Sequence, residues 1–124
     1  MLNLQELSTI WQHELPIKII VFDNDGYAMI KSTEKNLGMA YSGVSRETGI
    51  SLPNFRSLAQ NFGFAAQEVY RLNDLPEALD NLFSSKEPYL LQISTDPEQA
   101  FSPKLQPIVS GGQVRSPSFE ELSP

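Results

Sequence analysis

The residues best suited to chemistry form the tetrapeptide Asp23-Asn24-Asp25-Gly26. Two carboxylates, an amide oxygen and a flexible backbone at the glycine bring hard oxygen donors together, and such donors suit Mg²⁺ or Ca²⁺ better than zinc. The spacing does not fit the calcium loop of helix-loop-helix proteins, because Val21 occupies its first ligand position. Asp-Gly and Asn-Asp are also ordinary turn dipeptides, so a purely structural turn is the alternative.

The surroundings of the tetrapeptide favour a ligand. Residues 17–22 are predicted to form a strand, because only Lys18 interrupts a run of apolar residues, and this near-continuous apolarity predicts that both faces are covered. In open α/β sheets, ligands bind beyond the carboxyl ends of the strands. A helix predicted over residues 27–37 would add N–H groups and a positive dipole end, a combination that favours phosphate.

The remaining elements follow from apolar periodicity and from helix-ending residues such as Pro16 and Gly63. Further helices are predicted over 4–15, 53–62 and 73–83, strands over 65–70 and 89–94, and a loop over 38–51. The alternation of helices and strands predicts an α/β fold with three layers, in which a mostly parallel sheet is flanked by helices.

The last thirty residues differ in character from the rest of the chain. They hold five of the nine prolines and show no periodic apolar stripe. We therefore expect two regions, a domain over 1–94 and a proline-rich tail over 95–124 that is disordered or laid along another surface. Within this tail, Gly111-Gly112 is interpreted as a turn rather than a phosphate cradle.

Composition excludes several classes of function. The 124 residues fit one domain, and a net charge of −6 argues against binding to nucleic acid. The absence of cysteine excludes a disulfide framework, thiolate metal sites and a cysteine nucleophile. The longest apolar run, residues 19–22, is too short to span a membrane, and no secretory signal is evident at the amino terminus. A cytoplasmic setting is the resulting expectation.

Most of the chain resembles the diphosphate-binding domain of thiamine diphosphate-dependent enzymes, above all the acetolactate synthase-like decarboxylases and carboligases. The similarity covers roughly residues 2–100 and rests on the segments LQELST (4–9), LPIKIIVFDNDGYAMI (15–30), FRSLAQNFG (55–63), EAL (77–79) and PYLLQI (88–93). The family motif begins Gly-Asp-Gly and ends Asn-Asn. Its end falls on Asp23-Asn24, with aspartate in place of the first asparagine.

The resemblance implies a cofactor site. The Asn24 side chain and the Gly26 carbonyl would bind Mg²⁺, and this ion would bridge the two phosphates of thiamine diphosphate beside the backbone near Tyr27. A divalent ion also fits the charges, because Asp23 and Asp25 would otherwise repel a diphosphate. The Gly-Asp-Gly end of the motif would lie before Met1, so the chain is expected to be the carboxyl-terminal portion of a larger enzyme and inactive alone.

Further expectations concern substrate and partners. The resemblance implies decarboxylation or carboligation of 2-keto acids, a pyrimidine-binding domain or subunit that completes the site, and a homo-oligomer. The alternative is a non-catalytic α/β interaction module that retains the inherited fold.

The functions of several other side chains stay open at this stage. Tyr27, Met29 and Ile30 could line a substrate pocket, although core packing explains the last two equally well. The lone histidine, His13, is interpreted as a helix-surface residue. Four cations either meet an anionic substrate or stay solvated: Lys31, Lys35, Arg46 and Arg56.

Overall fold

The computed structural model describes residues 3–103, 105 and 107–121. The chain forms two compact units. The first comprises Met1–Asp23 and Pro53–Thr95, and the second comprises Asn24–Leu52 and Asp96–Pro124. These units differ from the predicted sequence regions 1–94 and 95–124, whose boundary stays a prediction.

The first unit is built on a parallel sheet. Its strands are β1 (Lys18–Asp23), β2 (Ala65–Val69) and β3 (Tyr89–Ser94), and they lie in the order β1-β3-β2. Both neighbouring pairs are parallel, so the predicted parallel arrangement is confirmed. Strand β3, the last of these three in the sequence, lies in the centre of the sheet, and β1 and β2 form its two edges.

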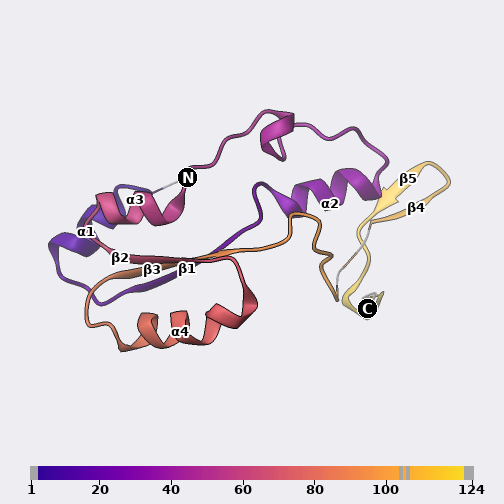
Figure 1. The fold of residues 1–124 in the computed structure, drawn as a ribbon. Helices are drawn as coiled ribbons and strands as arrows, with labels where there is room; N and C mark the ends of the chain where they lie inside the picture. Colours follow the sequence, from indigo (N-terminus) through magenta and orange to yellow (C-terminus); the bar gives the residue numbers. More distant parts are fainter. Residues whose placement is uncertain (1–2, 104, 106, 122–124) are drawn as a thin grey trace. The chain divides into compact units, whose positions relative to one another are not determined.

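Helices cover both faces of this sheet (Figure 1). Helix α4 (Leu75–Ser84) lies on one face, where Ala78 and Leu82 pack against Leu91. Helices α1 (Glu6–Gln12) and α3 (Phe55–Asn61) lie on the other face, where Ala59 packs against Leu90. Successive residues of a strand point to opposite faces, so β3 supplies one leucine to each core. The predicted three-layer α/β architecture is confirmed.

Local sequence signals account for the helix ends. The Asn54 side chain caps α3, because its Oδ1 accepts the Ser57 N–H at 2.7 Å. Beyond the helix, Gly63 has φ +88°, and a Cβ at this position would lie 2.7 Å from the Trp11 ring. Glycine avoids both the strain and the clash, which explains the predicted stop.

The prediction that the first strand is covered on both faces is wrong. Ile20 and Phe22 point to the α4 side of the sheet, and they are 38% and 69% exposed. The helix packs against β3 and β2. Since β1 lies at the sheet edge beyond β3, its side chains on that face extend past the helix.

The second unit contains helix α2 (Ala28–Asn36), as predicted for this segment. The predicted loop over 38–51 is wrong in part, because it holds a 3₁₀ helix at Arg46–Thr48 and Ser45 forms an antiparallel bridge with Gly26. The Thr48 hydroxyl accepts the N–H groups of Val44 and Ser45, at 2.9 and 2.8 Å. These hydrogen bonds hold the segment in a defined turn.

The described part of the tail has secondary structure, which differs from the alternative of a disordered tail, and the alternative of a tail laid along another surface stays a prediction. The described part of the tail forms a hairpin of β4 (Ile108–Ser110) and β5 (Gln113–Arg115), followed by a 3₁₀ helix at Phe119–Glu121. Gly111 and Gly112 form the turn with φ values of +59° and +77°. Two positive φ angles suit a tight hairpin, and glycine adopts them without strain. The glycine pair is therefore a turn, as predicted.

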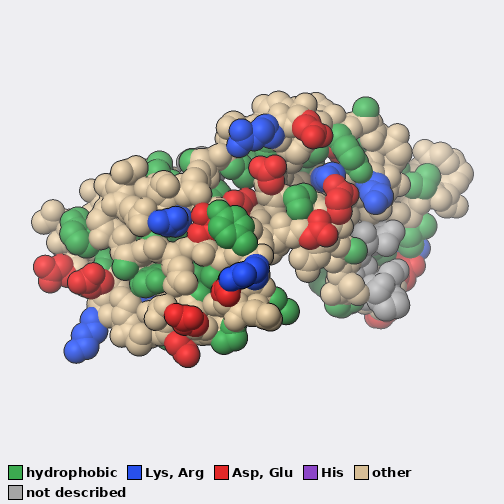
Figure 2. Space-filling model, in the orientation of Figure 1, with side chains coloured by type: hydrophobic (Ala, Val, Ile, Leu, Met, Phe, Trp, Pro, Cys, Tyr) green, Lys and Arg blue, Asp and Glu red, His purple; other side chains and the backbone are tan. Residues whose placement is uncertain are grey.

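Within the described residues, no helix combines the length and the apolar character needed to cross a membrane. On the face drawn in Figure 2, acidic and basic side chains are interspersed, and the basic ones do not gather over any one element.

Candidate functional site

The predicted ligand-binding residues line one hollow in the second unit. Asn24, Gly26 and Tyr27 border a space of about 260 Å³ together with residues of α2, of the 3₁₀ turn and of the chain after residue 96. The other lining residues are Asp25, Ala28, Lys31, Val44, Ser45, Arg46, Glu47, Pro97 and Glu98. Two segments that are distant in sequence, residues 44–47 and 97–98, thus meet the tetrapeptide and the start of α2.

Close packing requires a glycine at position 26. A Cβ on Gly26 would lie 2.1 Å from the Val44 carbonyl oxygen and 3.4 Å from Ser45 Cα. This carbonyl accepts the Tyr27 N–H at 2.8 Å, and Val44 is only 1% exposed. The backbone of residues 44–45 therefore lies directly against the turn and closes one wall of the hollow.

The amino terminus of α2 provides N–H groups beside the turn. The Tyr27 N–H donates to the Val44 carbonyl, and the Tyr27 carbonyl accepts the Lys31 N–H at 2.9 Å. The next three N–H groups, of Ala28, Met29 and Ile30, precede the ladder of helix hydrogen bonds and have no carbonyl partner within the helix. Backbone donors for an anion thus come from these residues rather than from Tyr27 itself.

The chemistry of the turn fits a hard cation. Among the described residues, the Asn24 side chain and the Gly26 carbonyl make no hydrogen bond. Amide and carbonyl oxygens of this kind are ligands that Mg²⁺ accepts. No group of three or more His, Cys, Asp or Glu side chains in the described part of the chain could hold a metal. A cation here would draw on the Asn24 and Gly26 oxygens together with oxygens of the diphosphate.

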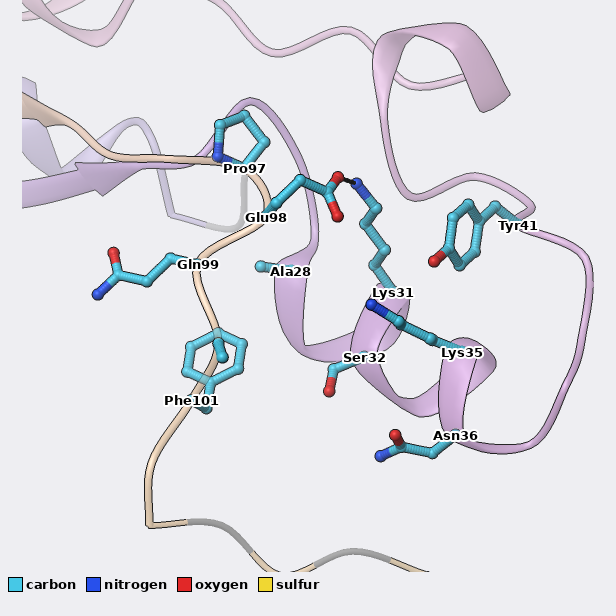
Figure 3. A pocket seen from close by; sticks show the side chains of 11 residues that line it. Ala28, Lys31, Ser32, Lys35, Asn36, Tyr41, Pro97, Glu98, Gln99 and Phe101 are labelled. Carbon is cyan, nitrogen blue, oxygen red and sulfur yellow. Dashed lines mark hydrogen bonds and ion pairs between the residues drawn. The ribbon is translucent and has the colours of Figure 1, made fainter. Parts of the chain in front are cut away.

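The charges around the hollow are close to balance. Lys31 and Arg46 face Asp25, Glu47 and Glu98 across the same space. Lys31 pairs with the Glu98 carboxylate, a contact drawn in Figure 3. Accepting a hydrogen bond from the ammonium, Glu98 raises the pKa of Lys31. The Glu98 carboxylate therefore pairs with the Lys31 ammonium, the cation that would otherwise be available to a phosphate in the hollow.

A smaller hollow of about 120 Å³ adjoins the same helix (Figure 3). Lys35 and Tyr41 line it, and the Lys31 ammonium lies 5.5 Å from the centre of the Tyr41 ring. At this distance the ring attracts the cation. Met29 and Ile30 line neither hollow and are 64% and 50% exposed, so core packing does not explain them.

The other predicted candidates do not line either hollow. Arg56 lies on α3 and His13 follows α1, so both belong to the first unit. The periodicity of the sequence gave no signal for Val44 or Glu98, because both lie outside the predicted helices and strands.

The fold and the turn define a class: an α/β domain with oxygen donors and helix N–H groups directly after a parallel strand. Residues 1–93 match the family described as thiamine pyrophosphate enzyme, C-terminal TPP binding domain. The chain belongs to this family, so the predicted family is confirmed. Thiamine diphosphate, the cofactor expected from the resemblance, is the cofactor for which this family is named.

Curated relatives are acetolactate synthases. The isozyme 2 large subunit of Escherichia coli (strain K12) is 32% identical over 123 residues, which are 99% of this chain and 21% of that protein. A probable large subunit of Methanocaldococcus jannaschii is 30% identical over 139 residues, with 98% and 22% covered. The chain thus spans about a fifth of the length of these relatives.

A solved structure shows the same fold. The thiamine diphosphate-dependent 4-hydroxybenzoylformate decarboxylase of Rhodococcus jostii RHA1 superposes with a TM-score of 0.66 at 22% identity. The superposition covers 79% of this chain and 18% of that chain.

Proposed function

We propose that this chain binds Mg²⁺ and the diphosphate of thiamine diphosphate, as the diphosphate-binding part of an enzyme that decarboxylates or condenses 2-keto acids. The observation that carries the proposal is the hollow in which Asn24, Gly26 and the amino terminus of α2 meet. Family membership supports the identity of the cofactor.

Each residue has a distinct part in this proposal. The Asn24 amide oxygen and the Gly26 carbonyl bind the metal, and the N–H groups of α2 donate to phosphate oxygens. Tyr27 lines the hollow with a side chain that is 45% exposed. A metal is needed because the three carboxylates that line the space outnumber its two cations, Lys31 and Arg46, so the lining does not offset the charge of a diphosphate. When bound, thiamine diphosphate supplies the carbanion chemistry.

The proposal includes partners. A pyrimidine-binding domain or subunit completes the site, the assembly is a homo-oligomer in the cytoplasm, and the 124-residue chain alone does not turn over substrate. The relatives are about five times as long as this chain, which supports the view that further parts take part in the reaction.

Calorimetry tests the binding proposal directly. Mg²⁺ with thiamine diphosphate is titrated into the chain, and saturable heat that EDTA abolishes is expected. Ligand at 100 times Kd would stabilise the folded chain by about 2.7 kcal/mol. Asn24→Ala removes a metal ligand and is expected to raise the Kd at least about tenfold, which corresponds to about 1.4 kcal/mol of binding free energy. Asn61→Ala, at the exposed end of α3, is the matched control. An Asn24→Ala variant that binds like the parent chain would contradict the proposal.

The second candidate is a non-catalytic interaction module, which the exposed apolar side chains of β1 favour. Ile20 and Phe22 form an uncovered strip on an edge strand, and such a strip suits contact with another subunit. In sedimentation equilibrium, this candidate predicts self-association that Phe22→Ser weakens, with no response to Mg²⁺ and thiamine diphosphate. Phe119→Ser alters a phenylalanine that is 82% exposed in the other unit and serves as the control.

A further inference from the structure

The described core contains one buried polar side chain, that of Gln92 in the central strand β3. It is 2% exposed, and both of its polar ends are used. Its Nε2 donates to Asp23 Oδ2 at 2.7 Å, and its Oε1 accepts the Arg56 N–H at 2.8 Å. A buried amide is tolerated only when such hydrogen bonds replace those to water.

The partners fix the orientation of this amide. A backbone N–H can only donate, so the oxygen of Gln92 must face Arg56, and its NH₂ group must face the carboxylate of Asp23. The Gln92 Nε2 is therefore the donor that faces Asp23 Oδ2. The Gln92 amide thus joins the amino-terminal turn of α3 to the end of β1.

Asp23 is held through its backbone as well. Its carbonyl oxygen accepts the Thr95 N–H at 2.8 Å and the Thr95 hydroxyl at 3.2 Å. The Asp23 carbonyl and the Asn24 N–H belong to one planar peptide group. Fixing both the side chain and the carbonyl of Asp23 therefore fixes the peptide from which Asn24 continues.

We propose that Gln92 is a positioning residue for the metal-binding turn. By holding the Asp23 carboxylate, it steadies the Asp23–Asn24 peptide group, from which the Asn24 side chain reaches the cation. This inference rests on the proposed function, because it deepens the role of the same turn. It also explains how the chain uses an aspartate where the family motif has its first asparagine: Gln92 supplies the donor that the carboxylate needs.

An exchange of donor and acceptor tests the proposal. Gln92→Glu keeps the acceptor for the Arg56 N–H but places two carboxylates together, so binding of Mg²⁺ with thiamine diphosphate is expected to weaken by 10- to 100-fold. Adding Asp23→Asn restores a donor opposite the new carboxylate, and affinity is expected to return to within about threefold of the parent chain. Calorimetry on the full chain gives both values.

The control is a glutamine on the neighbouring strand. Gln67 in β2 accepts hydrogen bonds from Asn81 and from the Tyr89 hydroxyl, and its amide does not contact Asp23. Gln67→Glu is expected to leave the affinity unchanged. Hydrogen exchange gives a second measurement: the Thr95 N–H, which donates to the Asp23 carbonyl at 2.8 Å, is expected to exchange about tenfold faster in Gln92→Glu and at the parent rate in the double variant.

The outcomes separate this inference from the proposed function. A parent chain that fails to bind Mg²⁺ with thiamine diphosphate overturns both. A parent chain that binds, together with a folded Gln92→Glu variant of equal affinity, overturns the role of Gln92 alone, as does a folded double variant that is not rescued. If Gln92→Glu does not fold, Gln92→Met takes its place, because it keeps the shape and removes both polar ends. The same loss of binding supports the proposal, and retained binding refutes it.

Discussion

Gly26→Ala tests whether close packing of the turn creates the site. The added Cβ would lie 2.1 Å from the Val44 carbonyl oxygen, whereas the shortest ordinary carbon–oxygen contacts are about 3.3 Å. The segment around Val44 must therefore retreat by about 1 Å, and its hydrogen bond from Tyr27 is lost or weakened.

The energy follows from these two effects. Overpacking costs about 1–3 kcal/mol, and the lost hydrogen bond adds about 1 kcal/mol. Gly26→Ala is thus expected to destabilise the second unit by about 2–4 kcal/mol. It should also weaken binding of Mg²⁺ with thiamine diphosphate, because one wall of the hollow moves. Urea unfolding and calorimetry measure the two effects.

Gly38→Ala is the control that separates packing from backbone strain. Gly38 has φ +66° with open space around its would-be Cβ, whereas Gly26 is not in the left-handed region. Gly38→Ala should therefore cost only the strain of that region, about 1–2 kcal/mol, and leave ligand affinity intact. If Gly26→Ala unfolds at the parent urea concentration and binds with parent affinity, the steric reasoning is refuted.

Three further predictions concern charge, core and pH. Glu98→Gln should tighten binding of Mg²⁺ with thiamine diphosphate in calorimetry and lower the pKa of Lys31, because Lys31 becomes free for phosphate; weaker binding would refute this. Leu82→Ala should cost about 2–5 kcal/mol in urea unfolding, since the side chain is fully buried; a cost below 1 kcal/mol would contradict the described core. The pKa of Glu121 is lowered to about 2 by the Arg115 guanidinium, so its stabilising effect is present above its unfolded pKa and is lost as pH falls toward 2. Carboxyl titration by NMR should show this pKa, and Arg115→Ala should return it toward 4.5.

Local patterns carried much of the prediction. Helix and strand positions follow from apolar periodicity, and the end of α3 follows from Gly63, because these signals act over a few residues. The tetrapeptide at 23–26 was identified for the same reason, since donor atoms and turn residues are adjacent in sequence. The segment 44–48 was missed because its turn depends on Thr48 hydrogen bonds rather than on any apolar stripe.

The sequence by itself determined the main helices and the three strands of the parallel sheet, the family and the oxygen-donor turn, since all of these depend on short-range order or on recognisable motifs. Only the tertiary structure decided that β3 lies between β1 and β2, and this order leaves Phe22 exposed. It also brought Gln92 to Asp23, 69 residues away, and Glu98 to Lys31, 67 residues away. Such pairings depend on how the whole chain packs, because no local propensity specifies which distant side chain will meet a given donor or acceptor.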